Sequence, residues 1–167
     1  MAASKKQGRA APAWRKIVSS ALDWEQAHAT LEAATRGLTP ELRGRRPDGL
    51  PHSAWELLDH IRRTQADLLE FMTNEDYVAP SWPRDYWPTP HEMPSASAWT
   101  KCLSAIDDDR AKLKRFAMRG SIDLTKKIPW GEGQTYLRCI LVVVDHTSYH
   151  VGQIILVRRL LGEWKDR

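Results

Sequence analysis

Four long segments of this chain repeat apolar residues at every third or fourth position, the spacing that aligns them along one side of an α-helix. The expected helices cover residues 13–36, 52–73, 95–119 and 135–161. Glycine and proline, which end or interrupt helices, are concentrated in the stretches between them. Since 167 residues suffice for one domain with a sizeable core, the pattern predicts an all-α fold, an up-down-type four-helix bundle.

The ends of these segments carry recognisable helix signals. Ser53 precedes the second segment and Glu56 follows three residues later, which is the spacing of a capping box. Thr135 is placed to cap the start of the last helix, and Gly37 and Gly120 to end the first and third. These local signals support the expected number of helices.

The first expected helix places a histidine on its apolar side. A histidine there can be a pocket wall, a hydrogen-bonding support for another histidine or a metal ligand, and the sequence leaves these roles open. The residues of this apolar side are Ile17, Ala21, Trp24, His28 and Leu31.

Residues 74–94 cannot form a regular helix, because prolines interrupt them repeatedly. The same stretch contains two tyrosines and two tryptophans, far more aromatic surface than a flexible linker carries. We expect an ordered loop between the second and third helices that packs across the bundle and covers a pocket. The connector at 122–134 is rich in turn-forming residues, and we expect a short extended segment or a hairpin in it.

The last expected helix contains two histidines, His146 and His150, four residues apart. This spacing places both imidazoles on the same side of a helix. Val143 and Ile154 share that side, so the pair is expected to face the core. Histidine is the commonest nitrogen ligand for zinc and related metals. The spacing leaves two interpretations open: a pair of metal ligands, or two hydrogen-bonded core residues.

A third histidine, His60, borders the inward side of the second expected helix. Together with His146 and His150 it would provide three nitrogen ligands and leave a coordination position open, as in catalytic metal sites. Ligand imidazoles commonly donate their second N–H to a nearby acceptor. The candidate acceptors are Glu56, Asp145 and Gln153.

The net charge of +4 is concentrated near the N-terminus. Lys5, Lys6 and Arg9 supply three positive charges within residues 1–12, which contain no acidic residue. We expect these residues to form a disordered basic tail that touches phosphates without sequence preference. A cluster of arginines at 43–46 is the other feature that favours nucleic acid, and we expect no specific nucleic-acid binding.

Two cysteines, Cys102 and Cys139, have no motif spacing and stand in apolar helical contexts. Free thiols in a reducing cytoplasm are the simplest interpretation. The longest uninterrupted apolar run, residues 139–144, is far shorter than the roughly 20 residues that span a bilayer. The aspartates at 107–109 precede lysines and arginines, and we expect an exposed helix side with local ion pairs.

Three stretches resemble the DinB-like superfamily of bacterial four-helix-bundle proteins, also described as damage-inducible-type metalloenzymes. Trp55-Glu-Leu-Leu-Asp-His60 is similar to the family's second helix, and Ile128-Pro-Trp-Gly131 to the connector before its last helix. Residues 146–154 resemble its closing His-x-x-x-His-x-Gly-Gln signature. The resemblance covers a single domain at residues 13–167.

The resemblance implies that His60, His146 and His150 form a three-histidine metal site. Zinc and nickel are the metals associated with this fold. It also implies that Gly152 is a point of close packing and Gln153 a polar residue near the site. Some relatives are metal-dependent transferases or isomerases that use low-molecular-weight thiols such as bacillithiol or mycothiol, and relatives often form homodimers.

Two functions follow as hypotheses. The first is a metal-dependent enzyme of the thiol S-transferase type that acts on a small-molecule substrate. The sequence shows no obvious general base, which favours a thiolate nucleophile over activated water. The second is a noncatalytic, dimeric binding or stress-response module, in which the histidines hold a structural metal or only form hydrogen bonds. A closed site with His28 as a fourth ligand would favour it.

Overall fold

The computed structural model describes residues 12–23 and 27–164. Three long helices dominate it: α4 (Ala54–Thr73), α5 (Ala96–Met118) and α6 (Tyr136–Leu160). Three short helices precede them, α1 (Ala13–Ala21), α2 (Leu31–Thr35) and α3 (Pro40–Arg43), and a single 3-10 turn, η1 (Arg84–Tyr86), lies between α4 and α5. The predicted all-α fold class is confirmed.

Each of the three long helices begins within two residues of its predicted start. Ser53 accepts a hydrogen bond from the backbone N–H of Glu56, and the Glu56 carboxylate accepts one from the N–H of Ser53. The side chains of Ser95 and Thr135 cap α5 and α6 by accepting one hydrogen bond each, from the N–H groups of Ala98 and Arg138. Each cap satisfies backbone donors that a helix start leaves without partners.

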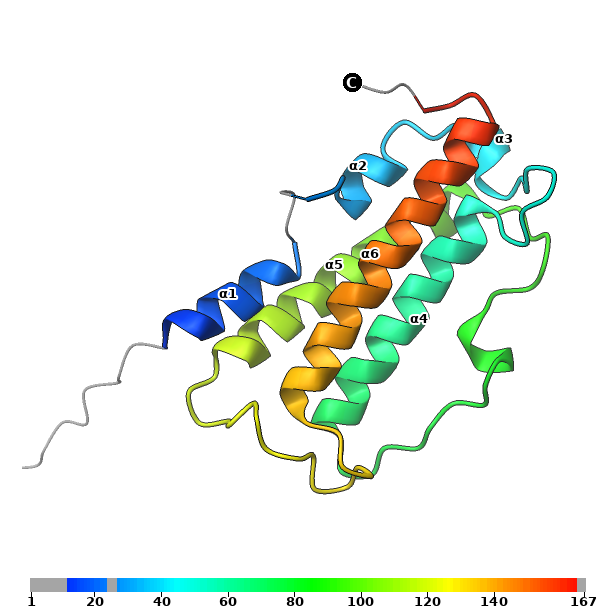
Figure 1. The fold of residues 1–167 in the computed structure, drawn as a ribbon. Coiled ribbons are helices and arrows are strands. Elements are labelled where there is room, and N and C mark those ends of the chain that lie inside the picture. The colour runs from blue at the N-terminus through cyan, green and yellow to red at the C-terminus, as the bar shows by residue number, and fades with distance from the viewer. Residues whose placement is uncertain (1–11, 24–26, 165–167) are drawn as a thin grey trace, which may run out of the picture.

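The long helices do not simply alternate in direction. The side chain of Gln65 on α4 donates to the carbonyl of Ile106 on α5, and Asp59, one and a half turns earlier, lies beside Cys102. Both positions advance together, so α4 and α5 run parallel, whereas α6 runs antiparallel to them (Figure 1). Taken in chain order, α1, α4, α5 and α6 therefore run up, down, down and up. The loop at 74–94 returns the chain along the outside of α4, to the end at which α5 begins.

The expectation of one continuous helix over residues 13–36 is wrong. The chain forms α1 and α2 with a break between them, because Thr30 takes an extended conformation and caps α2 through a hydrogen bond from the N–H of Ala33. His28 lies exposed in the bend before this cap, with its Nδ1 hydrogen-bonded to the carbonyl of Ala29. Trp24 lies outside the described residues.

The apolar side expected for α1 is also wrong. Ile17 is 58% exposed, while Arg15 and Ser19 are buried. The guanidinium of Arg15 donates to the carbonyls of Ala117 and Ile122, at the end of α5 and just beyond it. A periodicity of apolar residues cannot anticipate a helix that turns an arginine inward to cap its neighbour.

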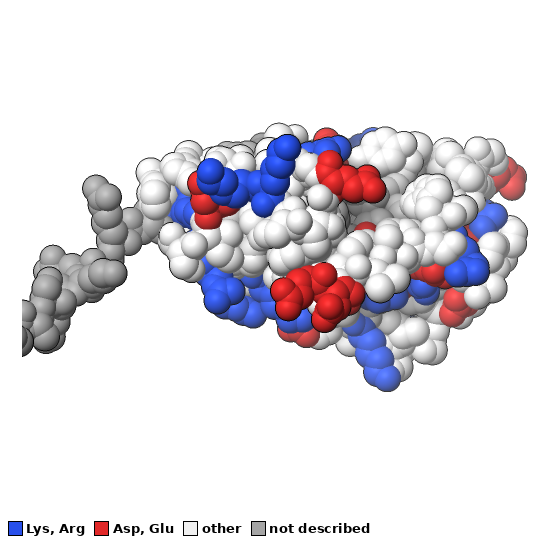
Figure 2. Space-filling view, turned by 90° about the horizontal axis from the view of Figure 1, so that it is seen from below, with Lys and Arg blue, Asp and Glu red and all other residues white. Residues whose placement is uncertain are grey.

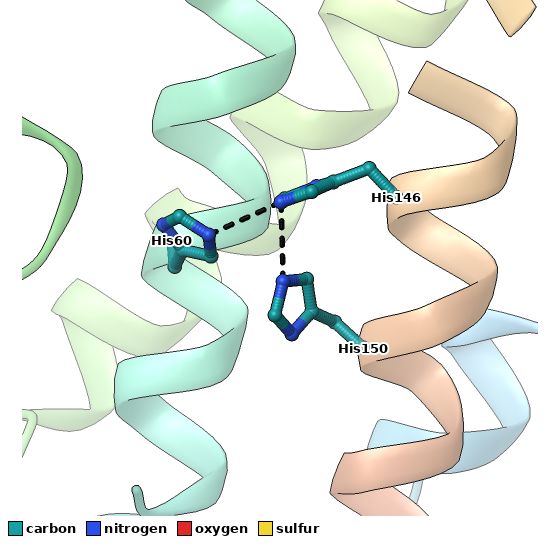
Figure 3. A group of neighbouring side chains, drawn as sticks. All are labelled: His60, His146 and His150. Carbon is teal, nitrogen blue, oxygen red and sulfur yellow. Dashed lines mark hydrogen bonds between the residues drawn. The ribbon is translucent and has the colours of Figure 1, made fainter. Parts of the chain in front are cut away.

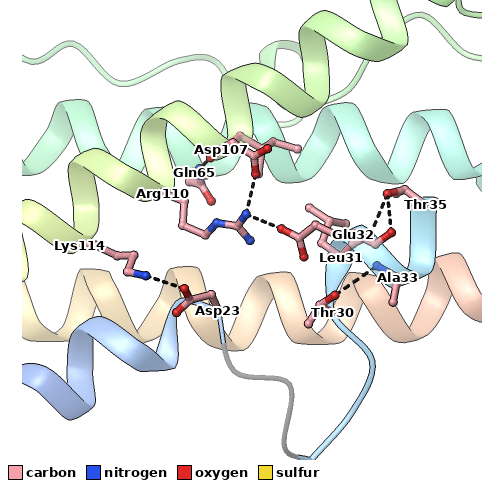
Figure 4. Close-up of polar contacts among 11 residues, drawn as sticks. Asp23, Thr30, Leu31, Glu32, Ala33, Thr35, Gln65, Asp107, Arg110 and Lys114 are labelled. Carbon is pink, nitrogen blue, oxygen red and sulfur yellow. Dashed lines mark hydrogen bonds and ion pairs between the residues drawn. The ribbon is translucent and has the colours of Figure 1, made fainter.

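Ion pairs hold both sides of the α1–α2 break against α5 (Figure 4). Arg110 binds Glu32 and Asp107, and Lys114 binds Asp23. Burial opposes ionisation of Glu32, but the hydrogen bonds to Arg110, to the backbone and to Thr30, together with the charge of Arg110, outweigh that effect and lower its pKa. The predicted local ion pairs of the 107–109 aspartates are present here and at Lys112, which binds Asp109.

The core consists of two apolar clusters that follow one another along the bundle. One packs α2 and the first half of α4 against the second half of α6. The other packs α1 and the last turns of α4 and α5 against the first half of α6. Buried members of the first include Leu58 and Ile154, and of the second Met72 and Ile140.

The outer side of α6 is largely apolar and uncovered, although the exposed Asp145 lies between Leu141 and Tyr149 on it. Five of its large apolar residues are exposed: Leu141, Val142, Tyr149, Leu156 and Leu160. By length and composition α6 could cross a membrane, with a mean hydropathy of 1.4 over the best window, of which 33% is buried. The expected close packing at Gly152 is wrong within this chain, since a Cβ there would meet nothing within 4 Å.

Charges of both signs are mixed over the surface (Figure 2), without a large field of one sign on the face shown. Two arginines of the 43–46 cluster are engaged within the protein: Arg46 binds Glu56, and Arg43 lies over the ring of Trp99. Residues 1–11 of the basic tail lie outside the described residues.

Candidate metal centre

The structure brings His60, His146 and His150 together between α4 and α6 (Figure 3). Nε2 of His146 lies 3.1 Å from Nε2 of His60 and 3.1 Å from Nε2 of His150. His60 and His150 are buried and His146 is half-buried. Two helices that are distant in sequence thus direct three imidazole nitrogens at one point.

The outer nitrogen of each imidazole has an oxygen partner. Nδ1 of His60 faces the backbone carbonyl of Tyr86 at 2.8 Å, and Nδ1 of His150 faces Oε1 of Gln153 at 2.6 Å. A carbonyl oxygen can only accept, so each of these Nδ1 atoms carries the proton and donates it. The neutral rings then present an unprotonated Nε2, which is the form that binds a metal.

The third histidine follows the same pattern through Thr64. Its hydroxyl donates to the carbonyl of His60, over 2.9 Å, and its oxygen lies 3.2 Å from Nδ1 of His146. With the hydroxyl proton used in this way, the oxygen accepts from His146. All three rings therefore carry their proton on Nδ1, and the lone pairs of the three Nε2 atoms point at one another.

Burial keeps these imidazoles neutral. Burial, followed by the charges of the nearby His150 and His60, lowers the pKa of His146 to about 4. Burial likewise lowers the pKa of His150 to about 4, against the opposing effect of the hydrogen bond to Gln153. The pKa of His60 is also lowered, mainly by burial. At neutral pH the three rings are therefore ready to act as ligands.

The nitrogen positions fit a divalent metal. Zinc binds imidazole nitrogen at about 2.0–2.1 Å, so two nitrogens in a tetrahedral site lie roughly 3.3 Å apart. The two closest pairs here are at 3.1 Å, and all three ligand atoms lie within 4.8 Å of one another. Three neutral ligands would not reduce the positive charge of the ion, and they would leave at least one of its coordination positions open.

An aromatic stack holds one side of the site. The indole of Trp87 lies between two imidazoles, 3.8 Å from that of His60 and 4.1 Å from that of His52, with planes at 3° and 14°. Two further aromatic rings are near the histidines and exposed. Trp82 is 6.5 Å from His60 and 68% exposed, and Tyr149 is 5.0 Å from His150 and 64% exposed.

Of the other candidate residues from the sequence, one contacts a site histidine and three do not. Gln153 is a hydrogen-bond partner of a site histidine, as the family signature implies. His28 lies exposed in the bend before α2 and is not part of the cluster. Asp145 is exposed on α6. Glu56 is occupied by Arg46 and by its own helix cap.

Sequence reasoning missed the supporting contacts. Thr64 follows His60 by one helical turn, so its place on the same side of α4 was a usable signal. The backbone carbonyl of Tyr86 gave no signal, because any residue type supplies one. Trp87 stood out only as part of an aromatic loop, and its stacking on His60 depends on how that loop folds back.

Comparisons with known proteins agree with this architecture. The sequence model of the DinB superfamily matches residues 23–154, a span that contains α4, α5, the three histidines and Gln153. No curated protein and no solved structure gave a match. The matched span covers most of the chain, and the chain belongs to the DinB superfamily.

Proposed function

We propose that this protein is a metal-dependent enzyme of the thiol S-transferase type, with zinc or nickel bound by His60, His146 and His150. One observation carries the metal assignment: three unprotonated Nε2 atoms face one another, two pairs of them only 3.1 Å apart. Converging lone pairs repel unless a cation lies among them. Each Nδ1 is already matched to an oxygen, which leaves the three Nε2 atoms to bind a cation.

Three neutral ligands support a catalytic rather than a structural role. Closed structural zinc sites commonly have four protein ligands, whereas catalytic sites keep a position for water or substrate. A divalent metal bound here would lower the pKa of a ligand thiol or water and supply a nucleophile near neutral pH. His28 lies outside the cluster, so it is not the fourth ligand that would have favoured a closed, noncatalytic site.

The carboxylates near the site are already engaged. Asp59 pairs with Arg62 and Arg63, and Glu56 pairs with Arg46, so neither is free to deprotonate water. A thiol needs less help, since its pKa is far below that of water. This supports thiol transfer: the thiol loses its proton, its sulfur bonds to an electrophilic carbon, and the leaving group takes the electrons of the broken bond.

The exposed aromatic rings of Trp82 and Tyr149 support an apolar group in the electrophilic substrate. Both lie within 7 Å of a site histidine, measured between ring centroids. Aromatic side chains near a reactive centre bind apolar groups and limit the access of water. A low-molecular-weight thiol as cosubstrate is carried over from relatives and forms part of the same proposal.

The test is a conjugation assay with untagged protein loaded with zinc or nickel. Several low-molecular-weight thiols are paired with apolar electrophiles, and product is followed by mass spectrometry. We expect conjugation that His146→Ala abolishes and that His28→Ala, a histidine outside the site, retains. Equal rates for the wild type and His146→Ala would exclude this function.

The noncatalytic, dimeric module remains a second candidate because of one observation, the uncovered apolar side of α6. That surface is suited to a partner and does not need chemistry. A protein that binds metal stoichiometrically but forms no conjugate with any thiol tested would support this alternative.

A further inference from the structure

The loop that follows α4 holds His60 from outside the bundle. Nδ1 of His60 donates to the backbone carbonyl of Tyr86 over 2.8 Å, and its ring lies flat on the indole of Trp87. Both contacts come from consecutive residues of one loop. The direction in which His60 points its Nε2 therefore depends on where the loop places residues 86 and 87.

The loop is anchored on the same side of α4. His60, Arg63 and Asp67 follow one another at three- and four-residue spacing, so they face one way. Arg63 donates to the backbone carbonyl of Asp85 over 3.1 Å. The hydroxyl of Tyr86 donates to Oδ2 of Asp67 over 2.8 Å. The carbonyl of Tyr86 thus orients the imidazole of His60, while the side chain of Tyr86 is fixed to Asp67, about two turns further along α4.

This hydrogen bond is available throughout the neutral range. A phenol is protonated at neutral pH and therefore remains a donor. A charged acceptor makes the bond stronger than one between neutral groups, which suits an anchor that must not shift.

We propose that Asp67 and Tyr86 are positioning residues of the metal centre: the carboxylate of Asp67 fixes Tyr86, and the carbonyl of Tyr86 fixes His60. The inference rests on the proposed metal site and names what preorganises it. Neither residue touches the metal or the substrate. Partners of this kind commonly change metal affinity by about 10- to 100-fold when they are removed.

A purely structural role is the competing explanation, in which Asp67 only ties the loop to the bundle. Tyr77 separates the two roles. Its hydroxyl donates to Oδ1 of the same carboxylate over 2.6 Å, and its ring packs against Phe71. Tyr77→Phe and Tyr86→Phe therefore each remove one phenol hydrogen bond to Asp67, but only Tyr86 also orients a site histidine.

The experiment measures zinc affinity by competition with a chelator, together with the visible absorption of the cobalt-loaded protein, whose bands report ligand geometry. For Tyr86→Phe we expect zinc affinity to fall by about 10-fold and the cobalt bands to change. For Tyr77→Phe we expect wild-type affinity and bands. Far-ultraviolet circular dichroism and the melting temperature of the metal-free proteins establish that both variants are folded.

A second measurement uses Asp67→Ala in the Tyr77→Phe background, which breaks the hydrogen bond to Tyr86 while leaving Tyr86 in place, and so covers the case in which Tyr86→Phe folds poorly. In the Tyr77→Phe background, Asp67→Ala and Tyr86→Phe remove the same remaining hydrogen bond. Two changes that break one interaction do not add. The combined variant should therefore lose as much zinc affinity as either change alone, and its cobalt bands should match theirs.

Two outcomes would overturn the inference. One is wild-type zinc affinity and cobalt bands in Tyr86→Phe; the other is an equal effect of Tyr77→Phe and Tyr86→Phe, which would indicate loop stability alone. Failure of the metal site itself looks different. In that case the wild type and His146→Ala would bind zinc equally weakly before any loop variant is made.

Discussion

His146 is half-buried and His150 buried, and the two imidazoles lie 3.1 Å apart between their Nε2 atoms. Burial lowers the pKa of each to about 4, far below the ordinary value of about 6.5. The neutral state is useful for binding a metal and costly when the surroundings become acidic. The free energy of unfolding should therefore depend on pH through these two side chains.

The metal-free protein should lose stability as the pH falls from about 6.5 to about 4. In this window the unfolded chain protonates these two histidines and the folded chain does not, so protons favour unfolding. Above pH 6.5 neither state binds the protons and the effect vanishes. Urea unfolding of metal-free protein at pH 7 and pH 5 measures the difference in unfolding free energy.

The matched variants are His146→Gln in the site and His28→Gln in the exposed bend. We expect His146→Gln to weaken the pH dependence and His28→Gln to leave it unchanged. The same slope in the wild type and in His146→Gln would show that the site histidines are protonated as readily as in the unfolded chain.

Helix starts could be predicted at the scale of elements because a cap is local. Ser53, Ser95 and Thr135 each accept a hydrogen bond from an N–H three residues later, and that geometry is encoded in the residues beside it. The first helix failed as a prediction for the opposite reason. Its inward side carries Arg15, whose acceptors lie more than 100 residues away.

The candidate site likewise has parts that the sequence predicts and parts that depend on how the chain folds. The helical spacing of His146 and His150 and the family signature pointed to the three histidines, while the structure supplied their meeting point. The oxygen that orients His60 is a backbone carbonyl, which no residue type encodes. Gly152 was assigned a packing role from the signature alone, and in this chain its surroundings are open.

Arg15 should be a major contact between α1 and α5. Its side chain is 4% exposed and donates to the carbonyls of Ala117, Arg119 and Ile122. Arg15→Met retains most of the volume but leaves buried carbonyls without donors. We expect the free energy of unfolding to fall by about 2–3 kcal/mol, since bonds from a charged donor contribute more than neutral ones.

Chemical denaturation of Arg15→Met and of Lys16→Met tests this contact. Lys16 is the next residue on the same helix and is exposed, so its substitution should change stability by less than about 0.5 kcal/mol. Equal stability of the two variants would mean that α1 contributes little to holding α5.

The whole molecule leaves one long apolar side of a helix uncovered, and we propose that a second copy of the chain covers it. Exposed residues of α6 recur at three- and four-residue spacing, with Gly152 among them and room above it for a close approach. An isologous contact through such a side would form a two-fold dimer. The free, buried cysteines fit the further proposal of a reducing cytoplasm.

Sedimentation equilibrium should give a dimer for the wild type and a monomer for Leu156→Glu, because a carboxylate in an apolar interface is costly. Val78→Glu is the control, since Val78 is 83% exposed in the loop after α4 rather than on α6, and it should remain dimeric. A wild-type monomer at micromolar concentration, or equal effects of both variants, would contradict this interface.

Elemental analysis of untagged protein shows whether His60, His146 and His150 bind one divalent metal. We expect about one zinc or nickel per chain in the wild type and in His28→Ala, and a loss of that metal in His150→Ala. A wild type that contains no metal, even after incubation with zinc and nickel, would contradict this expectation. The three histidines would then be hydrogen-bonded core residues.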